Sequence, residues 1–314
     1  MGKLNDSASP HLRGNASVTR IMLCVILALL PAAITGCLNY GRHAALVLLV
    51  TVSAAVLFDF FSGLVFKRIN CVKDMSAAVT GLLLGMCLPP DFPLWKAAIG
   101  SFLAIVAVKQ AFGGIGKNIA NPAAAAWIML LLVFHKDMTT WRIPMTETIV
   151  SSAQPLSGSV GYWDLLFGST AGNIGETCAA GLILGGIFLC LCGITSPAAP
   201  VGFLGSFALL SWIGGFDVPE QLLTGAVMIG AFFFANDYTT TPLTKSGKFL
   251  FGTGCGVLTF LIRHYGGFSD GTLIAVAAMN LFTPMLDRLT APVPFGAVRK
   301  KKTKKSKKQE TAAA

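Results

Sequence analysis

Apolar segments of about helix length follow one another along most of this chain, separated by short polar stretches. Ten of them are expected to form helices, at residues 21–40, 44–66, 75–89, 95–112, 121–135, 175–193, 199–215, 220–235, 248–265 and 271–288. A helix needs about 20 residues to cross the hydrocarbon core of a bilayer. The pattern predicts an all-α polytopic membrane protein with about ten transmembrane helices.

Two of the segments, 75–89 and 121–135, are short for a bilayer crossing and carry glycine or proline at their ends. Broken helices survive in a membrane only where the freed backbone groups line a cavity enclosed by protein. We therefore expect the third and fifth helices to be interrupted beside such a cavity.

The composition excludes an ordinary soluble protein. Hydrophobic residues make up 54% of the chain and charged residues 12%, with a mean hydropathy of +0.69, whereas soluble domains carry about 25% charged residues. The first apolar run lacks a convincing cleavage site and is interpreted as a retained helix. The eight cysteines show neither a four-ligand metal spacing nor a disulfide framework, so no metal site is expected.

Basic residues are distributed unequally between the two sets of loops. If both termini are cytoplasmic, the cytoplasmic loops hold 11 Lys and Arg residues, without the C-terminal tail, against five on the other side. Lys109 is counted on the cytoplasmic side and Arg263 on the other. This bias follows the positive-inside rule. The tail itself, RKKKTKKSKK at 299–308, is interpreted as an anchor to anionic membrane lipid or a docking segment for a partner. Nucleic acid is not an expected partner, because no recognition domain accompanies the tail.

These patterns divide the chain into five parts. They are a cytoplasmic N-terminal segment (1–20), a first transmembrane half (21–135), an extracytoplasmic loop (136–174), a second transmembrane half (175–290) and a basic cytoplasmic tail (291–314).

The two halves share a weak internal repeat. VTGLLLGMCLPPD (79–91) precedes GGIGKNIANPAAAAW (113–127), as LTGAVMIGAFFFAND (223–237) precedes GGFSDGTLIAVAAMNLFTP (266–284). Because five helices per half is an odd number, the halves would insert as two inverted five-helix repeats, with a binding site near the membrane midplane between them. A chance resemblance among glycine-rich helices is the alternative.

Three polar residues within these repeats, Asn118, Asn121 and Asp237, are candidate ligand-binding residues. Asn121 precedes a proline, which is typical of a helix start, so capping is the alternative for this residue. Asp237 follows a long apolar run, where a carboxylate needs a partner, a proton or a ligand. Amide and carboxylate groups match the edge of a planar heterocycle such as flavin, and equally suit a small polar solute such as urea. Four nearby aromatic residues would stack on a ring or pack in the core: Phe112, Phe232, Phe233 and Phe234.

Five stretches together resemble one protein family. They are SPHLR (9–13), VTGLLLGMCLPPDFPLW (79–95), KQAFGGIGKNIANPA (109–123), GNIGET (172–177) and FFFANDYTTTPLT (232–244). In this order they resemble the D subunits of Rnf-type ion-translocating electron-transport complexes and, more distantly, the B subunits of sodium-pumping NADH:quinone oxidoreductases.

The resemblance implies one component of a translocase in the bacterial inner membrane, which is not catalytic alone. It would pass electrons through flavin and so couple ferredoxin–NAD redox chemistry to Na⁺ or H⁺ movement. Its implied partners are the other Rnf-type subunits: the membrane proteins A and E, the flavin protein G and the iron–sulfur proteins B and C. The implied fold is similar to urea transporters. A non-covalent flavin, riboflavin, would lie between the halves at Asn118, Asn121 and Asp237.

The family also carries an attachment loop, D-[AG]-x-[ST]-G-A-T, whose last threonine is esterified to the phosphate of FMN. The matching stretch here is IVSSAQPLSG (149–158), which places Gln154 at the threonine and Thr148 at the aspartate. An amide has no hydroxyl oxygen to esterify. Three interpretations stay open: FMN bound without a covalent bond, attachment through Ser151, Ser152 or Ser157, or loss of this flavin.

The competing hypothesis is a redox-inactive channel or transporter for a small, urea-like solute. The missing attachment threonine favours it slightly. The sequence shows no acid–base dyad or catalytic triad under either hypothesis, so no catalytic residue is expected.

Overall fold

The structure, a computed structural model, describes residues 17–66, 74–114, 116–144, 149–150, 161–168, 170–268 and 270–292. A helix lies within each of the ten predicted apolar segments, and the label η marks a π-helix. The elements are α1 (Val18–Tyr40), α2 (Arg42–Val65), α3 (Ser76–Met86), α4 (Leu94–Phe102), η2 (Leu103–Gln110), α5 (Pro122–Val133), α6 (His135–Met138), β1 (Trp141–Arg142), β2 (Ile149–Val150), α7 (Tyr162–Phe167), α8 (Ala179–Leu191), α9 (Ala198–Ile213), α10 (Val218–Leu223), α11 (Val227–Ile229), η3 (Gly230–Phe234), α12 (Lys245–Tyr265) and α13 (Thr272–Thr290).

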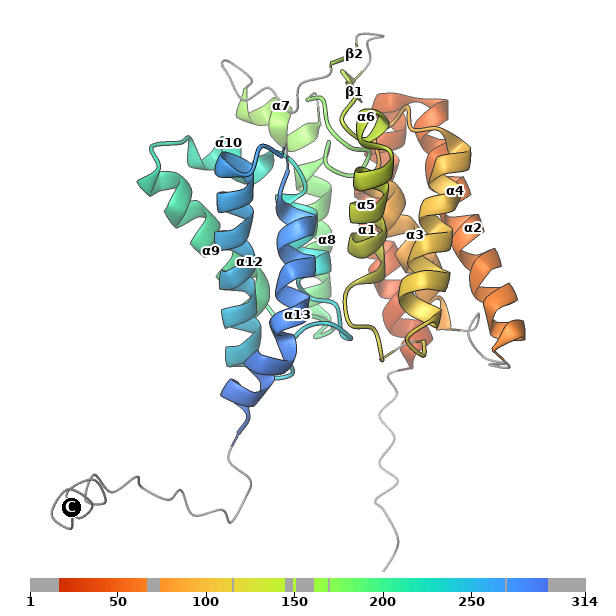
Figure 1. Cartoon of the computed structure of the whole chain (residues 1–314). Coiled ribbons are helices and arrows are strands. Elements are labelled where there is room, and N and C mark those ends of the chain that lie inside the picture. Colours follow the sequence, from red (N-terminus) through yellow and green to blue (C-terminus); the bar gives the residue numbers. More distant parts are fainter. Residues whose placement is uncertain are drawn as a thin grey trace, which may run out of the picture.

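The helices form one bundle with two distinct ends (Figure 1). Helix α1 begins, and α13 ends, at what we call the terminal end. The elements α6, β1 and α7 lie at the opposite end, which we call the loop end. Strands β1 and β2 pair antiparallel there, with Trp141 opposite Val150.

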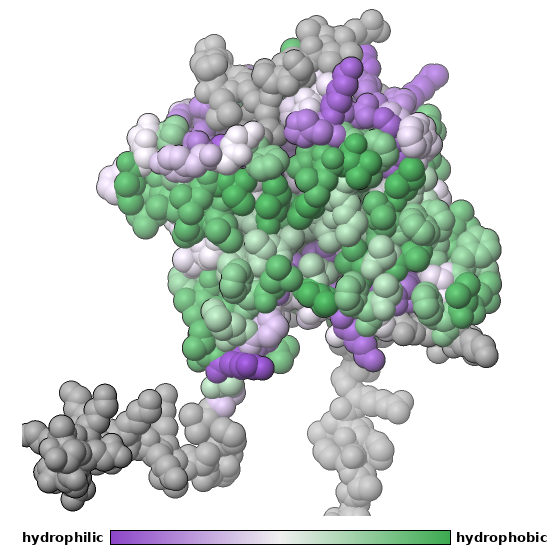
Figure 2. Space-filling view, in the orientation of Figure 1, coloured by the Kyte–Doolittle hydropathy of each residue, from purple (hydrophilic) through white to green (hydrophobic). Residues whose placement is uncertain are grey.

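The outer surface is that of a membrane protein. Figure 2 shows a hydrophobic band around the middle of the visible face, with hydrophilic residues gathered mainly toward the two ends. Leu132, Leu191 and Trp212 are among the large apolar side chains that are most exposed. Helices α1 and α2 are long and apolar enough to cross a membrane, while α3, α5, α8 and α9 are apolar but shorter. The number of ten crossings therefore stays a prediction.

Helices α1 to α5 form one group and α8 to α13 another (Figure 1). The groups meet where α1 packs against α8 and where α5 packs against α13. Small residues allow close packing within the groups, as is usual where lipid replaces water around helices. At Gly81 of α3, a Cβ atom would lie 2.7 Å from the backbone oxygen of Thr51 in α2.

The helices are interrupted where the sequence predicted it and at one further place. Helix α3 ends at Met86 and α5 begins at Pro122, as expected for the third and fifth segments. The eighth segment, predicted as one helix, is divided into α10, α11 and η3. The fourth segment continues as a π-helix after Phe102. π-Helical turns are rare and frequent at functional sites.

Two residues treated as loop charges in the orientation argument are buried. Lys109 lies in η2 and pairs with Asp59, and Arg263 lies in the last turn of α12 and pairs with Asp270. Each charge is held inside the protein by its partner. Because the two were counted on opposite sides, removing both leaves the excess of basic residues on the same side.

Candidate functional site

A cavity lies between the two helix groups, in the part of the molecule nearer the terminal end. It has about 770 Å³ of empty space, including its open mouth. We call it the inner cavity. Its lining residues are Met22, Val25, Ser76, Val79, Thr80, Leu83, Lys109, Asn118, Asn121, Pro122, Ala123, Leu189, Thr195, Phe232, Phe233, Asn236, Asp237, Tyr238 and Thr239. The three candidate residues from the sequence, Asn118, Asn121 and Asp237, are therefore brought together.

Asn121 both caps a helix and reaches across the cavity. Its Oδ1 accepts hydrogen bonds from the backbone N–H groups of Ala123, at 3.0 Å, and Ala124, at 3.2 Å. These are free N–H groups at the start of α5, and Pro122 fits the first helical position. The Nδ2 of Asn121 donates to Oδ2 of Asp237 at 3.1 Å. The capping alternative is thus confirmed, and the same amide still joins the two halves.

Asp237 lies in the turn that follows η3 and is held by hydroxyl groups. Its Oδ2 accepts from the hydroxyls of Thr239 and Thr240, both at 3.1 Å, in addition to Asn121. Among the ion pairs of the described residues, none includes Asp237. Hydrogen bonds therefore hold this carboxylate at the cavity wall, where a ligand with an N–H or O–H group would meet it.

Two acceptors at the cavity lack partners. The Oδ1 atoms of Asn118 and Asn236 are buried and form no hydrogen bond with any described residue. The Nδ2 of Asn236 donates to the backbone oxygen of Phe232 at 3.2 Å, which fixes that amide. An unsatisfied buried acceptor costs about 1–3 kcal/mol. A ligand that carries N–H or O–H donors would remove this cost.

Asn280 of α13 forms hydrogen bonds with the backbone of the same wall. With its amide oxygen toward the backbone N–H of Asn121, it accepts at 3.0 Å and donates to the backbone oxygen of Thr240 at 3.2 Å. It thereby fixes the backbone on both sides of the Asn121–Asp237 hydrogen bond.

The aromatic candidates divide between the cavity and other places. Phe232 and Phe233 line the inner cavity. Phe234 is fully buried in the hydrophobic core, and Phe112 is exposed away from the cavity. Core packing is thus the role of Phe234, and only Phe232 and Phe233 of these four are placed to contact a bound ring.

The GNIGET stretch completes the broken end of α3. The backbone N–H of Gly175 donates to the oxygen of Met86 at 2.7 Å, and that of Ile174 donates to Leu88 at 3.1 Å. The indole N–H of Trp127 donates to the backbone oxygen of Cys87 at 2.9 Å. A helix end leaves carbonyl groups without partners, and these three donors satisfy them. A Cβ atom on residue 175 would lie 2.6 Å from Cβ of Met86, so this approach requires glycine.

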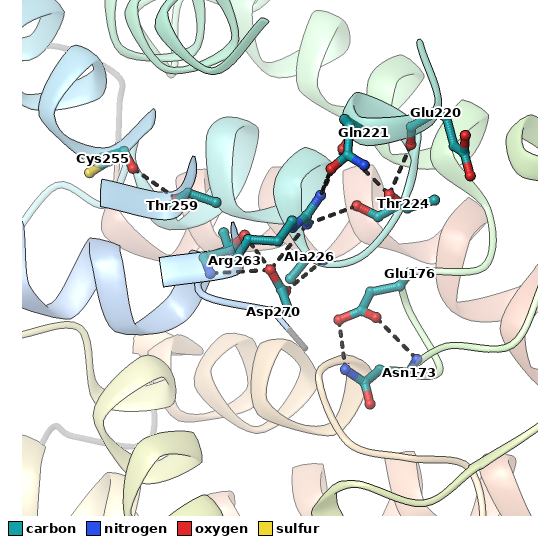
Figure 3. A network of polar contacts seen from close by, with 11 residues as sticks. Asn173, Glu176, Glu220, Gln221, Thr224, Ala226, Cys255, Thr259, Arg263 and Asp270 are labelled. Carbon is teal, nitrogen blue, oxygen red and sulfur yellow. Dashed lines mark hydrogen bonds and ion pairs between the residues drawn. The ribbon is translucent and has the colours of Figure 1, made fainter. Parts of the chain in front are cut away.

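A second polar network, toward the loop end, joins α10, α12 and α13 (Figure 3). The guanidinium of Arg263 donates to the backbone oxygens of Gln221, at 2.9 Å, and Thr224, at 3.2 Å, and to Oδ1 of Asp270, at 3.2 Å. Oδ2 of Asp270 accepts from the backbone N–H of Ala226 at 2.9 Å. This network satisfies the backbone where α10 ends, as the GNIGET donors do for α3.

Glu176 lies beside this network without joining it (Figure 3). Its two carboxylate oxygens accept from the side chain of Asn173, at 2.6 Å, and from the backbone N–H of the same residue, at 3.2 Å. Oδ1 of Asn173 in turn accepts from the indole N–H of Trp141 at 3.1 Å. The pair thus connects the GNIGET stretch to β1.

A second cavity, which we call the outer cavity, opens toward the loop end. It has about 890 Å³ of empty space, including its mouth. Its lining residues are Trp127, Leu131, His135, Met138, Thr139, Trp141, Arg263, Gly267, Phe268 and Asp270. The Nε of Arg263 is buried and has no hydrogen-bond partner among the described residues. Aromatic faces and an N–H donor without a partner among the described residues suit a planar ligand with acceptor groups.

The predicted attachment position, Gln154, lies outside the described residues. Strand β2, the last described element before it, ends at Val150 and pairs with β1. Trp141 of β1 lines the outer cavity. Val150 thus lies next to a wall of the outer cavity. Within the described residues, no group of three or more His, Cys, Asp or Glu side chains is placed to hold a metal ion.

Sequence reasoning missed a buried carboxylate behind the cavity wall. Asp59, in the apolar helix α2, is fully buried and accepts hydrogen bonds from Lys109 and Gln110. The signal was present, because a carboxylate and a lysine both occur inside apolar segments. Nothing local in the sequence says that the two segments pack together.

Nearly the whole chain matches known proteins. Residues 5–296 match the family described as NQR2, RnfD, RnfE. The chain is 39% identical to the D subunit of a proton-translocating ferredoxin:NAD(+) oxidoreductase complex of Clostridium ljungdahlii, over 93% of this chain and 96% of the relative. It is 38% identical to the D subunit of the Na(+)-translocating ferredoxin:NAD(+) oxidoreductase complex of Acetobacterium woodii, over 96% and 98%. It is 31% identical to the D subunit of an ion-translocating oxidoreductase complex of Escherichia fergusonii, over 92% and 97%.

Proposed function

The chain belongs to the NQR2, RnfD, RnfE family, and on this basis we propose that it is the membrane flavoprotein component of a bacterial ion-translocating electron-transport complex. It works as part of a translocase and not as an enzyme alone. The partners are the other subunits of an Rnf-type complex: the membrane proteins A and E, the flavin protein G and the iron–sulfur proteins B and C. The complex couples electron transfer between ferredoxin and NAD to the movement of an ion.

The observation that carries the flavin proposal is the donor and acceptor set of the inner cavity. The unpartnered oxygens of Asn118 and Asn236 need donors, and a flavin supplies a ring N–H and the hydroxyls of its side chain. Asn121 and Asp237 form a hydrogen-bonded part of the cavity wall, and Phe232 and Phe233 offer aromatic surface. When bound, the flavin supplies the one-electron chemistry, while the protein binds it, orients it and excludes water. The non-covalent flavin, of the riboflavin type, is assigned to this cavity.

We assign FMN, where it is present, to the outer cavity. The aromatic walls and the free Nε of Arg263 fit a planar ring with acceptor groups. Gln154 provides no hydroxyl for a phosphoester, so FMN would be held here without a covalent bond at that position. In this arrangement the two cavities lie toward opposite ends of the bundle, which fits two flavins that act in sequence on one electron path.

The element order supports ten crossings in two inverted halves. The series α1, α2, α3, α4–η2, α5 corresponds to α8, α9, α10–η3, α12, α13. Helix α1 starts at the terminal end, whereas α8 starts at the loop end (Figure 1). Packing of α2 on α4 is matched by packing of α9 on α12. If the terminal end lies on the cytoplasmic side of the inner membrane, the distribution of basic residues follows the positive-inside rule.

A direct test is to purify the complex with its partner subunits, denature it and identify the released flavin by chromatography. The expected result is one riboflavin-type flavin per chain in excess of the flavin that the partner subunits hold. A complex without it, together with uptake of urea-like solutes by vesicles that contain this chain alone, would favour a redox-inactive channel.

A further inference from the structure

A buried ion pair forms part of the inner cavity wall. The Nζ of Lys109 in η2 donates to Oδ1 of Asp59 in α2, at 3.0 Å, and to the hydroxyl of Ser76 in α3, at 2.8 Å. The Lys109 side chain is 3% exposed and that of Asp59 is 0% exposed. Lys109 and Ser76 both line the cavity. An ammonium group is thus fixed in the wall of the cavity that Asp237 lines from the other half.

The pair is poorly explained as a device for stability. Lysine is almost never fully buried unless it is paired, and replacing a buried ion pair by apolar residues is often neutral or stabilising. The helix that carries Lys109 is also a π-helix, a geometry that is frequent at functional sites. Stability alone therefore does not account for the pair, and its place at the cavity wall favours a role in the cavity.

Lys109 has one donor to spare. An ammonium group carries three N–H donors, and the described residues accept only two of them. Gln110 also donates to Oδ1 of Asp59, at 2.7 Å, which holds the carboxylate in place. Asp59, Gln110 and Ser76 together fix the position of Nζ, and the remaining donor is available to a molecule in the cavity.

We infer that Lys109 is the charge-compensating donor of the inner cavity, an inference that rests on the proposed flavin site. Its free N–H donor would hydrogen-bond an acceptor atom of a bound flavin, and its charge would stabilise the negative charge that the flavin gains on reduction. The electron would come from a one-electron redox centre of the partner subunits. Lys109 keeps its proton, and no covalent bond forms or breaks. Asp59 and Ser76 are positioning residues that act through Lys109.

Two variants of opposite expected sign test this inference in the purified complex. The double variant Asp59→Asn with Lys109→Gln removes both charges, keeps the net charge and leaves no buried charge without a partner. It is expected to lower the midpoint potential of the non-covalent flavin by about 60 mV or more, a tenfold change for one electron. Asp59→Asn alone leaves the lysine without its counter-charge and is expected to raise the midpoint.

Two further variants serve as controls. Lys109→Arg keeps the positive charge, so its midpoint potential is expected to lie closer to that of the unmodified complex than to that of the double variant. Lys117→Gln removes a positive charge from an exposed residue of the neighbouring turn that does not line the cavity, and is expected to leave the midpoint unchanged. The measurement is a spectroelectrochemical titration, with the non-covalent flavin identified as the signal that the Asp237→Ala variant lacks.

The outcomes separate the inference from the function on which it rests. An unchanged midpoint in both the double variant and Asp59→Asn, with flavin bound, would overturn the role of Lys109 and leave the flavin site standing. If the double variant does not assemble, the midpoint potential of Asp59→Asn alone tests the inference: a raised midpoint supports the role of Lys109, and an unchanged one overturns it. Absence of the non-covalent flavin from the unmodified complex would instead overturn the proposed function.

Discussion

Asn121 and Asp237 are 116 residues apart in the chain, yet the Nδ2 of one lies 3.1 Å from the Oδ2 of the other. Asn121 starts the last helix of the first group, and Asp237 follows the interrupted segment of the second group. Their hydrogen bond thus joins the two groups at the wall of the inner cavity. The same amide also caps α5, so its binding role and its structural role need separate tests.

Replacing Asn121 by Ser is expected to separate these roles. Serine caps a helix nearly as well as asparagine, but it is too short to reach Asp237. The variant should keep the thermal stability of the complex and lose at least tenfold in affinity for the non-covalent flavin. Asn121→Ala, the comparison variant, should lose flavin and also about 1 kcal/mol of stability through the lost cap. Equal flavin content in Asn121→Ser and the unmodified protein would assign Asn121 to capping alone.

The carboxylate of Asp237 is expected to matter for binding more than for assembly. Asp237→Ala should remove non-covalent flavin and slow electron transfer, while most of the complex still assembles. Asp237→Asn keeps an acceptor for the hydroxyls of Thr239 and Thr240. Its flavin content and electron-transfer rate should lie between those of Asp237→Ala and the unmodified protein.

The control for Asp237 is Asp91→Ala, which removes an exposed carboxylate that lines neither cavity. Flavin content per chain and electron-transfer rate are measured for all three variants. Poor expression of Asp237→Ala with a normal yield of Asp91→Ala would show that Asp237 is structural. Unchanged flavin and turnover would remove it from the site.

The chain is expected to carry no covalent flavin at position 154. After acid precipitation and denaturing electrophoresis, its band should not fluoresce under ultraviolet light, because glutamine offers no hydroxyl for a phosphoester. A fluorescent band would contradict this. In that case the triple variant Ser151→Ala, Ser152→Ala, Ser157→Ala shows whether a neighbouring hydroxyl has taken over attachment.

The approach of the GNIGET stretch to α3 should not tolerate a side chain. In Gly175→Ala the new Cβ would meet Cβ of Met86 at 2.6 Å, so the donors to the broken helix end must move. Loss of such contacts is expected to destabilise the complex by about 1–3 kcal/mol. Gly205→Ala in α9 is the matched control, because nothing lies within 4 Å of its Cβ position. It should be neutral or slightly stabilising, because alanine has a higher helix propensity than glycine. Thermal unfolding of the two variants makes the comparison.

The apolar pattern was sufficient to place the helices, because burial in lipid and burial in a protein core both act on each segment locally. It located α1, α2 and α9 closely and predicted the breaks near Met86 and before Pro122. Local chemistry also indicated the cap at Asn121. The interruption between α10 and η3 was not predicted, because no proline or polar run marks it. It depends on Arg263 and Asp270, which satisfy the freed backbone groups from other helices.

By itself, the sequence determined which segments are apolar and which of their residues are too polar to face lipid. The tertiary structure decided which polar residues meet. The pairs Asp59–Lys109 and Asn121–Asp237 and the fit of GNIGET against α3 depend on contacts between distant segments. Hydropathy is a property of each residue alone and is therefore visible in the sequence, whereas a hydrogen bond needs two groups within about 3 Å of each other. Only the packing of the helices brings them that close.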